Sequence, residues 1–256
     1  MLRTRVIPAL LLHGKSLVKT ERFGKYQYIG DPANTVRIFN ELEVDELCFL
    51  DIKAARTRMS PDFVVLREIA TECFMPLSYG GGINSLETAK RVFDTGFEKI
   101  IINTAAYTNP SLITEIANVY GSQAVVVSMD VKTHFWKGKC LVAQGGTRWR
   151  STPPVDWAKK VEDLGAGEIL LTSVDREGTW KGFDIPLIHQ VSAAVAIPVV
   201  AHGGAGNEKD MRKAIQEGGA SAVALGSCVV FQKQGMGVLV NFLSQSSMHS
   251  LQKYNN

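Results

Sequence analysis

Two glycine clusters in this sequence have the residue types and spacing of an anion-binding site. Gly80-Gly81-Gly82 follows the short apolar run 76–79, and Gly203-Gly204 follows the similar run 198–202, which begins 122 residues later. Glycines at the end of a strand let successive backbone N–H groups turn toward a ligand and form a nest for phosphate. One cluster alone would fit a tight turn equally well. The recurrence favours two phosphate nests, and hence a ligand with two phosphates.

A single carboxylate is placed for acid–base chemistry. Asp130 comes directly after the apolar run 124–129, where partial burial would raise the pKa of its side chain. Its position is equally consistent with a carboxylate that caps the following loop. The corresponding residue in the first half of the chain, 119 residues earlier, is Leu11. A leucine cannot transfer a proton, so the two halves are not chemically equivalent.

Four further charges occur at the starts of apolar runs: Arg5, Glu46, Lys99 and Glu168. Two positive and two negative side chains at one end of a barrel could form a ring of salt bridges around its axis. Spacing alone favours the simpler interpretation, in which these are ordinary charges at strand ends. The pattern by itself leaves both interpretations open.

These candidate residues need a scaffold of repeated strands and helices. Helix starts such as Asp31-Pro32 and Asn207-Glu208 separate short runs rich in Val, Ile and Leu, which are typical of strands buried on both faces of a parallel sheet. The runs lie at about 5–12, 45–52, 75–79, 98–103, 124–130, 167–173, 197–201 and 220–226. Eight strands alternating with about eight helices predict an α/β fold of the TIM (β/α)8 barrel type. A doubly wound open sheet is the alternative, but it does not predict a twofold repeat.

The repeat indicates two similar half-barrels that share one core. We expect a single domain over 1–256, with half-barrels at about 1–120 and 121–240. The tail, 244–256, is expected to be frayed or to form a short final helix. Active sites of TIM barrels lie at the carboxyl ends of the strands. We therefore expect the glycine nests and Asp130 on the same face.

Two connections are long enough to cover that face. The segment 13–30 carries four basic residues, including Lys19, and is predicted to be a mobile lid. The segment 135–150, with Trp136 and Trp149, is predicted to form a hairpin over the mouth of the barrel.

Composition argues against several functional classes. The net charge of +3 is too small to indicate nucleic acid binding, although anionic small molecules remain candidate partners. No stretch approaches the roughly 20 apolar residues of a membrane helix. The four cysteines show no Cys-x-x-Cys spacing and the five histidines no paired ligand spacing, which predicts reduced thiols, a cytoplasmic location and no metal site. No cofactor is expected.

Longer motifs carry a family resemblance. From Arg5 to about Phe231, the sequence resembles the cyclase subunit of imidazole glycerol phosphate synthase. Among the matching motifs are Gly80-Gly81-Gly82-Ile83, Asn103-Thr104-Ala105-Ala106, Asn109-Pro110-Ser111-Leu112-Ile113, Gly165-Ala166-Gly167-Glu168-Ile169-Leu170-Leu171-Thr172-Ser173 and Gly203-Gly204-Ala205-Gly206.

The resemblance implies a TIM barrel that accepts ammonia from a docked glutaminase subunit. It also implies that ammonia attacks a bisphosphorylated ribulosyl aminoimidazole carboxamide nucleotide, giving imidazole glycerol phosphate and aminoimidazole carboxamide ribotide. The family's ammonia gate matches Arg5, Glu46, Lys99 and Glu168, and its flexible-loop lysine matches Lys19. Its phosphate-binding positions match Gly82, Asn103 and Thr104 in the first half, and Gly178, Gly203, Gly204 and Ser227 in the second.

Three departures from the family pattern change the expected function. The family uses two aspartates as its acid–base pair; Asp130 matches one, but Leu11 replaces the other. Glu177 stands where an aspartate is usual, and His202 where a serine is usual. Loss of one partner of an acid–base pair commonly costs a factor of about 10² to 10⁴ in rate. The sequence is therefore not expected to encode an efficient imidazole glycerol phosphate synthase.

Three functional hypotheses follow. The first is a cyclase-like subunit that delivers ammonia to a different acceptor; here the chain resembles a branch of the family associated with amidine groups on bacterial surface sugars, where a third protein activates the sugar amide. The second is a working histidine-pathway cyclase in which His13 or His202 replaces the missing acid, although phosphate contact or packing is the more ordinary role for His202. The third is a ligand-binding barrel without an ammonia role.

Overall fold

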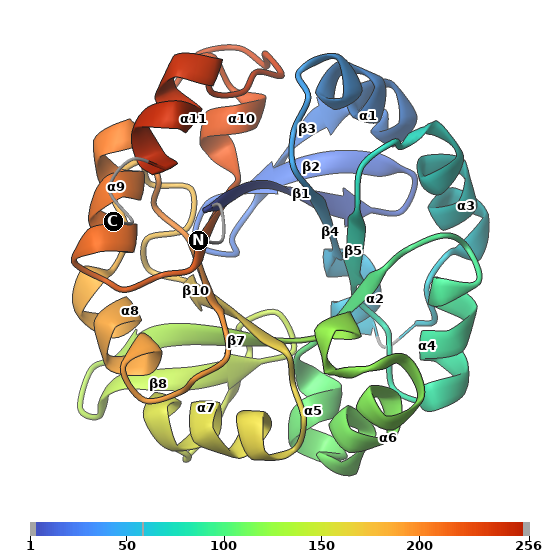
Figure 1. Cartoon of the computed structure of the whole chain (residues 1–256), viewed down its shortest axis with the longest axis vertical. Helices are drawn as coiled ribbons and strands as arrows, with labels where there is room; N and C mark the ends of the chain where they lie inside the picture. Colours follow the sequence, from blue (N-terminus) through green and yellow to red (C-terminus); the bar gives the residue numbers. More distant parts are fainter. Residues whose placement is uncertain (1–3, 58, 253–256) are drawn as a thin grey trace.

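Eight parallel strands close into a barrel in the computed structural model, which describes residues 4–57 and 59–252 (Figure 1). Each strand pairs in parallel with its neighbours, and β1 closes the barrel by pairing with both β4 and β12. The barrel strands are β1 (Arg5–His13), β4 (Leu47–Asp51), β5 (Leu77–Gly80), β6 (Lys99–Ile102), β7 (Val125–His134), β10 (Glu168–Ser173), β11 (Val199–His202) and β12 (Ala222–Leu225). The predicted TIM barrel is confirmed.

Helices connect successive strands and cover the outside of the barrel (Figure 1). The longer ones are α1 (Pro32–Glu41), α3 (Phe63–Glu72), α4 (Leu86–Phe93), α6 (Ser111–Tyr120), α7 (Pro154–Asp163), α8 (Ile185–Ser192), α9 (Glu208–Gln216) and α11 (Gln245–Gln252). The short ones are α2 (Ile52–Thr57), α5 (Thr104–Thr108), α10 (Ser227–Val230) and the 3₁₀ turn Ser122–Ala124.

Side-chain caps fix the helix starts that the sequence predicts. The Asp31 carboxylate accepts a hydrogen bond of 2.9 Å from the amide of Asn34 at the start of α1. At the start of α9, the Asn207 side chain accepts from the Asp210 amide while the Asp210 carboxylate accepts from the Asn207 amide. Such caps satisfy amides that have no acceptor within the helix, and each typically contributes about 1 kcal/mol.

The barrel interior is an apolar cluster separate from the larger core between barrel and helices. Alternate side chains of each strand point inward, and between the two ends of the barrel most inward positions carry aliphatic residues, together with Cys48 and the Ser78 hydroxyl, which donates to the carbonyl oxygen of Leu47. The interior cluster consists of Ile7, Ala9, Cys48, Ile101, Val126, Leu170, Val200, Ala222 and Ala224, with Leu50 packed against it. Burial raises the pKa of the Cys48 thiol to about 12, so this side chain is uncharged at neutral pH.

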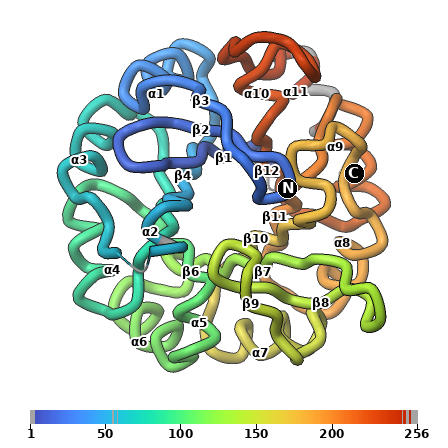
Figure 2. The backbone as a smooth tube through the Cα atoms, turned by 180° about the vertical axis from the view of Figure 1, so that it is seen from behind, coloured from blue at the N-terminus to red at the C-terminus, as the bar shows by residue number. Residues whose placement is uncertain are grey.

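Two hairpins project from the carboxyl ends of the strands. Both lie on the side that faces the viewer in Figure 2. One is formed by β2 (Ser16–Thr20) and β3 (Tyr26–Gly30), and the other extends β7 through β8 (Gly138–Ala143) and β9 (Arg148–Trp149). The second hairpin agrees with the prediction for 135–150. The first hairpin lies in the segment 13–30, which is predicted to be a lid: Leu17 and Val18 are buried, and the segment forms paired strands against β1.

The tail agrees with the predicted short helix as far as it is described. Helix α11 packs Met248 and Leu251 into the core; residues 253–256 of the predicted tail lie outside the described part. Among the described residues, no helix is long and apolar enough to cross a membrane.

Candidate functional site

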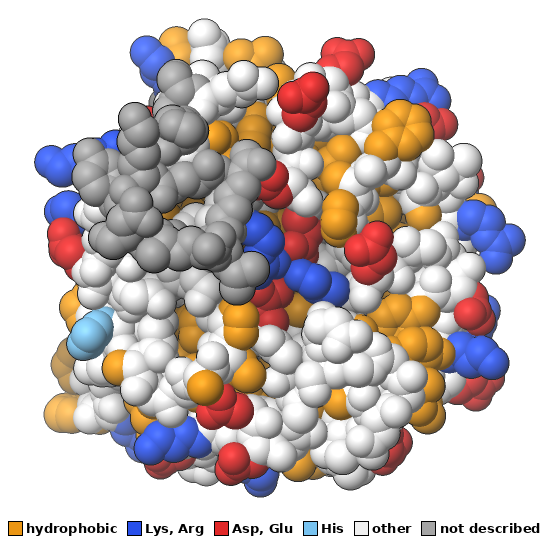
Figure 3. Space-filling view, in the orientation of Figure 1, with side chains coloured by type: hydrophobic (Ala, Val, Ile, Leu, Met, Phe, Trp, Pro, Cys, Tyr) orange, Lys and Arg blue, Asp and Glu red, His pale blue; other side chains and the backbone are white. Residues whose placement is uncertain are grey.

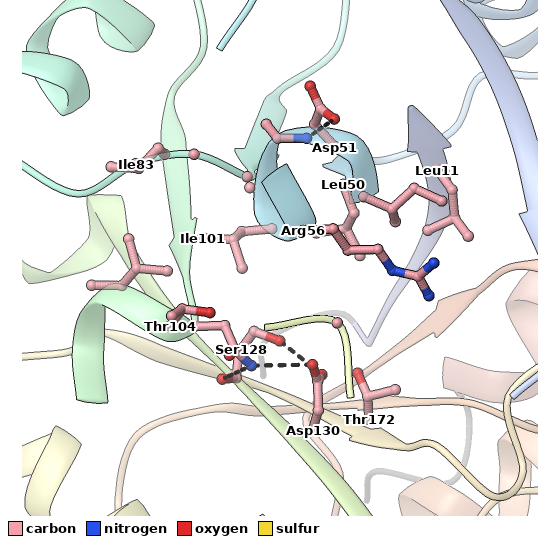
Figure 4. A pocket seen from close by; sticks show the side chains of 18 of the residues that line it. Leu11, Leu50, Asp51, Arg56, Ile83, Ile101, Thr104, Ser128, Asp130 and Thr172 are labelled. Atoms are coloured by element: carbon pink, nitrogen blue, oxygen red, sulfur yellow. Dashed lines mark hydrogen bonds between the residues drawn. The ribbon is translucent and has the colours of Figure 1, made fainter. Parts of the chain in front are cut away.

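A cavity of about 460 Å³ opens at the carboxyl ends of the strands (Figure 4). It collects several of the predicted site residues, although they come from distant parts of the chain. Its lining includes Leu11, Gly82, Asn103, Thr104 and Asp130. The residues that the strand-end rule selects from the sequence thus line one cavity in the structure.

Asp130 is the buried carboxylate of the cavity. Its Oδ2 accepts a hydrogen bond of 3.1 Å from Asn103 Nδ2, and its Oδ1 accepts one of 3.2 Å from the Ser128 hydroxyl. Burial raises the pKa of Asp130 to about 7, against the opposing effect of hydrogen bonds from Ser128 and Thr172. A carboxyl group with such a pKa can both accept and donate a proton near neutral pH.

Leu11 lines the same cavity from the other side of the barrel (Figure 4). Its neighbours there include Leu50 and Ile101, so this side of the cavity is apolar. The nearby carboxylate of Asp51 is already engaged, because Oδ1 accepts hydrogen bonds of 2.9 and 2.8 Å from the amides of Lys53 and Ala54. Asp51 thus caps α2.

The first nest, Gly80–Gly82 with Asn103 and Thr104, opens into this cavity. Gly82 has a φ of +70°, and a Cβ atom there would lie 2.3 Å from the carbonyl oxygen of Met59, so only glycine fits. Thr104 is the first residue of α5, which leaves its amide without an acceptor inside the helix. Asn103 joins the nest to the carboxylate of Asp130.

The second nest, Gly178, Gly203, Gly204 and Ser227, is also brought together, but around a space of only about 10 Å³. The three glycines have φ values of +76°, +93° and +109°, a conformation that disfavours side chains. The remaining wall is formed by Lys19, Glu177 and His202, among others.

Lys19 and Glu177 form a buried ion pair at the second nest, with side chains only 5% and 2% exposed. The sequence predicts Lys19 to be on a mobile lid; instead it lies inside the protein, because strand pairing fixes β2 and Glu177 neutralises its charge. His202 is buried beside them, with Nδ1 3.1 Å from the Thr172 hydroxyl. Burial and the charge of Lys19 lower the pKa of His202 to about 3, so its imidazole is neutral and cannot replace a missing acid near pH 7.

Four charges meet at the opposite end of the barrel, where the strands begin; we call them the charge ring: Arg5, Glu46, Lys99 and Glu168. Arg5 donates to Glu46 Oε2 at 2.6 Å and also pairs with Glu168. Lys99 Nζ lies 3.1 Å from Glu46 and 3.3 Å from Glu168. The salt bridges therefore form a closed cycle, and acidic and basic side chains meet at the centre of one end of the molecule (Figure 3).

Comparison with known proteins places this architecture in a family. Residues 5–234 match the family described as "Histidine biosynthesis protein". This chain belongs to that family.

Three relatives share nearly the whole HisF-like chain. It is 47% identical over 242 residues to the "Putative imidazole glycerol phosphate synthase subunit hisF2" of Pseudomonas aeruginosa, covering 94% of this chain and 96% of the relative. It is 43% identical over 248 residues to the "Putative imidazole glycerol phosphate synthase subunit hisF3" of Vibrio vulnificus, covering 96% and 95%. It is 40% identical over 231 residues to the "Imidazole glycerol phosphate synthase subunit HisF" of Leptospira biflexa, covering 90% and 91%.

Some residues of this HisF-like cavity escaped the sequence reasoning. Thr172 lies level with Asp130 on the neighbouring strand, and Ser128 lies two residues before Asp130, deeper in the barrel; both side chains hydrogen-bond to Asp130. Alternation could have found them, because Val126 and Leu170, two residues earlier, face the barrel interior. Arg56 also lines the cavity, but no pattern identified the short helix α2 that carries it. Within the described residues, no cluster of His, Cys, Asp and Glu is arranged to hold a metal ion.

Proposed function

We propose that this HisF-like chain is the synthase subunit of a glutamine-dependent amidotransferase. In this proposal a glutaminase subunit docks at the end of the barrel that carries the charge ring. Ammonia enters there, crosses the barrel interior and reacts with an acceptor in the cavity at the other end. The observation that carries the proposal is the complete charge ring beneath a cavity in which Asp130 faces Leu11 instead of a second carboxylate.

The charge ring is suited to admit a neutral molecule. Its two positive and two negative side chains pair with each other, so the entrance carries no net charge. Lys99 donates to both oxygens of Glu46 at 3.1 Å and to one oxygen of Glu168 at 3.3 Å, and its movement alone would open one side of the ring.

The barrel interior above the ring favours the same species. Its lining is mostly aliphatic, the Cys48 thiol is uncharged, and the Ser78 hydroxyl donates to the carbonyl oxygen of Leu47. Moving a charged ammonium into such surroundings would cost several kcal/mol, whereas an uncharged molecule meets no such penalty. The interior thus supports transfer of ammonia and exclusion of ammonium from the path.

The cavity supports chemistry that needs one proton-transfer group. Asp130, with a pKa of about 7, can accept the proton released when ammonia attacks a carbon atom. Leu11 provides no partner for a second proton transfer. An acceptor activated beforehand, with a good leaving group, fits these residues better than one that must be cyclised.

We assign the acceptor to an activated sugar amide of bacterial surface polysaccharide synthesis, supplied with the help of a third protein. The support is the resemblance of the sequence to the amidine-forming branch of the family, together with the apolar residue at position 11.

A second candidate is a functional cyclase of histidine biosynthesis. The observations that favour it are the relatives named imidazole glycerol phosphate synthase subunits and the open first nest beside Asp130. Turnover of the bisphosphorylated nucleotide by the purified chain, with ammonium salt as the nitrogen source, decides between the two. We expect turnover at least about 10²-fold below that of ordinary enzymes; a rate in the ordinary range would establish the histidine-pathway function.

The ammonia path is tested by reversing a charge in the ring. We expect Lys99→Glu to abolish recovery of glutaminase activity with the complex or to release ammonia to solvent, because three carboxylates would then meet at the entrance. Lys90→Glu, on the exposed face of α4, is the matched control and should behave as wild type. The proposal would be contradicted if both variants transferred ammonia from the glutaminase to the acceptor equally well. It would also be contradicted if the tagged wild-type chain recovered no glutaminase.

A further inference from the structure

We infer that the acceptor of this chain carries a single phosphate, which binds at the first nest, because the protein's own Lys19–Glu177 ion pair closes the space at the second nest. The inference rests on the proposed function, which puts the acceptor in the cavity at the carboxyl ends of the strands.

The two nests differ greatly in space. The first opens into the cavity of about 460 Å³, whereas the second surrounds about 10 Å³. A cavity needs roughly 10 to 15 Å³ on this measure to hold one water molecule. A phosphate group therefore enters the second nest only if the side chains that fill it move.

The carboxylate of Glu177 lies at the edge of the second nest, between its small space and the large cavity, and holds Lys19 across it. It pairs with the Lys19 ammonium, and both of its oxygens lie 3.2 Å from the Thr20 hydroxyl. Its Oε2 also accepts a hydrogen bond of 3.2 Å from the amide of Phe23. An ammonium, a hydroxyl and a backbone amide are donors that commonly bind phosphate oxygens. Here they already bind a carboxylate.

Close packing restrains the Lys19 side chain, in addition to its ion pair with Glu177. Its Cε lies 2.8 Å from the position that a Cβ atom would take on Gly226, so the side chain runs directly over this glycine beside Ser227. Its Nζ donates a second hydrogen bond of 2.7 Å to the carbonyl oxygen of Thr20. Lys19 is the one cation among the described residues that line this space, since His202 is neutral near pH 7.

The first nest retains what a phosphate needs. Gly82 and Thr104 both line the open cavity, and Arg56 lines it too. The Asn103 side chain is bound by the Asp130 carboxylate, but within the described residues no hydrogen bond joins a carboxylate to the amides of Gly82 and Thr104. A phosphate at the first nest would leave the rest of the acceptor over Asp130.

The test counts phosphate at each nest. The full chain, labelled with ¹⁵N, is titrated with inorganic phosphate, and amide shifts of Gly82 and Thr104 are compared with those of Gly203 and Gly204. We expect the wild type to bind one phosphate, at the first nest. Glu177→Ala frees Lys19 and opens space, so we expect it to bind a second phosphate at Gly203 and Gly204, whereas Glu68→Ala, which removes an exposed charge on α3, should still bind one.

The outcomes separate this inference from the proposed function. Two phosphates bound by the wild type with similar affinity would overturn the inference and leave the proposed function intact, and so would a Glu177→Ala variant that gains no site. Binding at neither nest in the wild type would instead overturn the proposal of a phosphate-bearing acceptor in this cavity. If Glu177→Ala does not fold, Glu177→Asp, which keeps the charge but shortens the side chain, should gain the second site.

Discussion

The two halves of this barrel have similar backbones at the carboxyl ends of their strands, but they differ in which half has an open glycine nest and which has the carboxylate. The first half has an open glycine nest, and Leu11 stands where the second half has a carboxylate. The second half has that carboxylate, Asp130, but its nest is closed by Lys19 and Glu177. The difference at the nests follows the repeat: Gly80 in the first half corresponds to His202 in the second, at the offset of 122 residues. Gly80 lines the large cavity, whereas His202, with Lys19 and Glu177, lines the small space at the second nest.

The comparison shows which parts of a repeated site can diverge independently. The glycines have positive φ angles in both halves, and neighbouring backbone lies too close to them for any side chain. A Cβ atom on Gly82 would clash with the carbonyl oxygen of Met59, and a Cβ atom on Gly204 would clash with that of Gly182. The side chains around the glycines are free of that constraint. Ligand selection can therefore change while the backbone nests persist.

The largest expected effect is on stability at the second nest. Glu177→Ala leaves the Lys19 ammonium buried without its partner, and breaking a buried ion pair in this way typically destabilises a protein by about 3 to 5 kcal/mol. Chemical denaturation of the two proteins measures the difference. The double variant Lys19→Met/Glu177→Ala should recover much of this loss, because it leaves no unpaired charge. Equal loss in the single and double variants would mean that the two side chains are not coupled.

A smaller effect is expected from the carboxylate that the second half retains. The pKa of Asp130 is about 7 in the folded protein and about 3.9 in an unfolded chain, so between these values the folded state holds a proton that the unfolded state lacks. Stability must then fall as pH rises from about 4 to 7. Asp130→Asn removes this ionisation, and its stability relative to wild type should rise by about 3 kcal/mol over the same range.

Urea denaturation at several pH values measures this difference. Asp156→Asn, which removes a carboxylate from the exposed face of α7, controls for the loss of one negative charge. Parallel curves for wild type and Asp130→Asn would mean that Asp130 ionises as it does in the unfolded chain, and the asymmetry between the two halves would lose its chemical basis.

How much of this was predictable depends on the sequence separation of the interacting groups. The strands and helix starts follow from local patterns, such as the Asp31-Pro32 cap, and the repeat determined how the units combine. The Lys19–Glu177 pair joins residues 158 positions apart, and no local pattern in the sequence predicts that the Glu177 side chain contacts Lys19. The basic residues around Lys19 favoured the prediction of a mobile lid, whereas the apolar pair Leu17 and Val18 is buried in a strand of the structure.

A substitution at the first nest should change the stability of the protein only slightly, because few hydrogen bonds within the protein would be lost. Thr104→Val removes the hydroxyl that accepts a hydrogen bond of 3.0 Å from the Gln144 amide, so we expect a loss of about 1 kcal/mol. The same variant should weaken phosphate binding at the first nest, as measured by the amide shift of Gly82. A loss as large as that of Glu177→Ala would remove the energetic contrast between the nests.

The smallest effect is expected from restoring the missing carboxylate alone. Leu11→Asp puts a carboxyl group opposite Asp130 in the cavity. We expect it to raise ammonium-dependent turnover of the bisphosphorylated nucleotide less than about tenfold, which corresponds to about 1.4 kcal/mol of transition-state stabilisation. The reason is that the second phosphate of that nucleotide would still lack a binding site. Leu11→Asp/Glu177→Asp restores both the carboxylate and the space at the second nest, and it should gain more than the two single variants together. A large gain from Leu11→Asp alone would mean that the Lys19–Glu177 pair yields readily to the ligand, and position 11 alone would then separate the two halves.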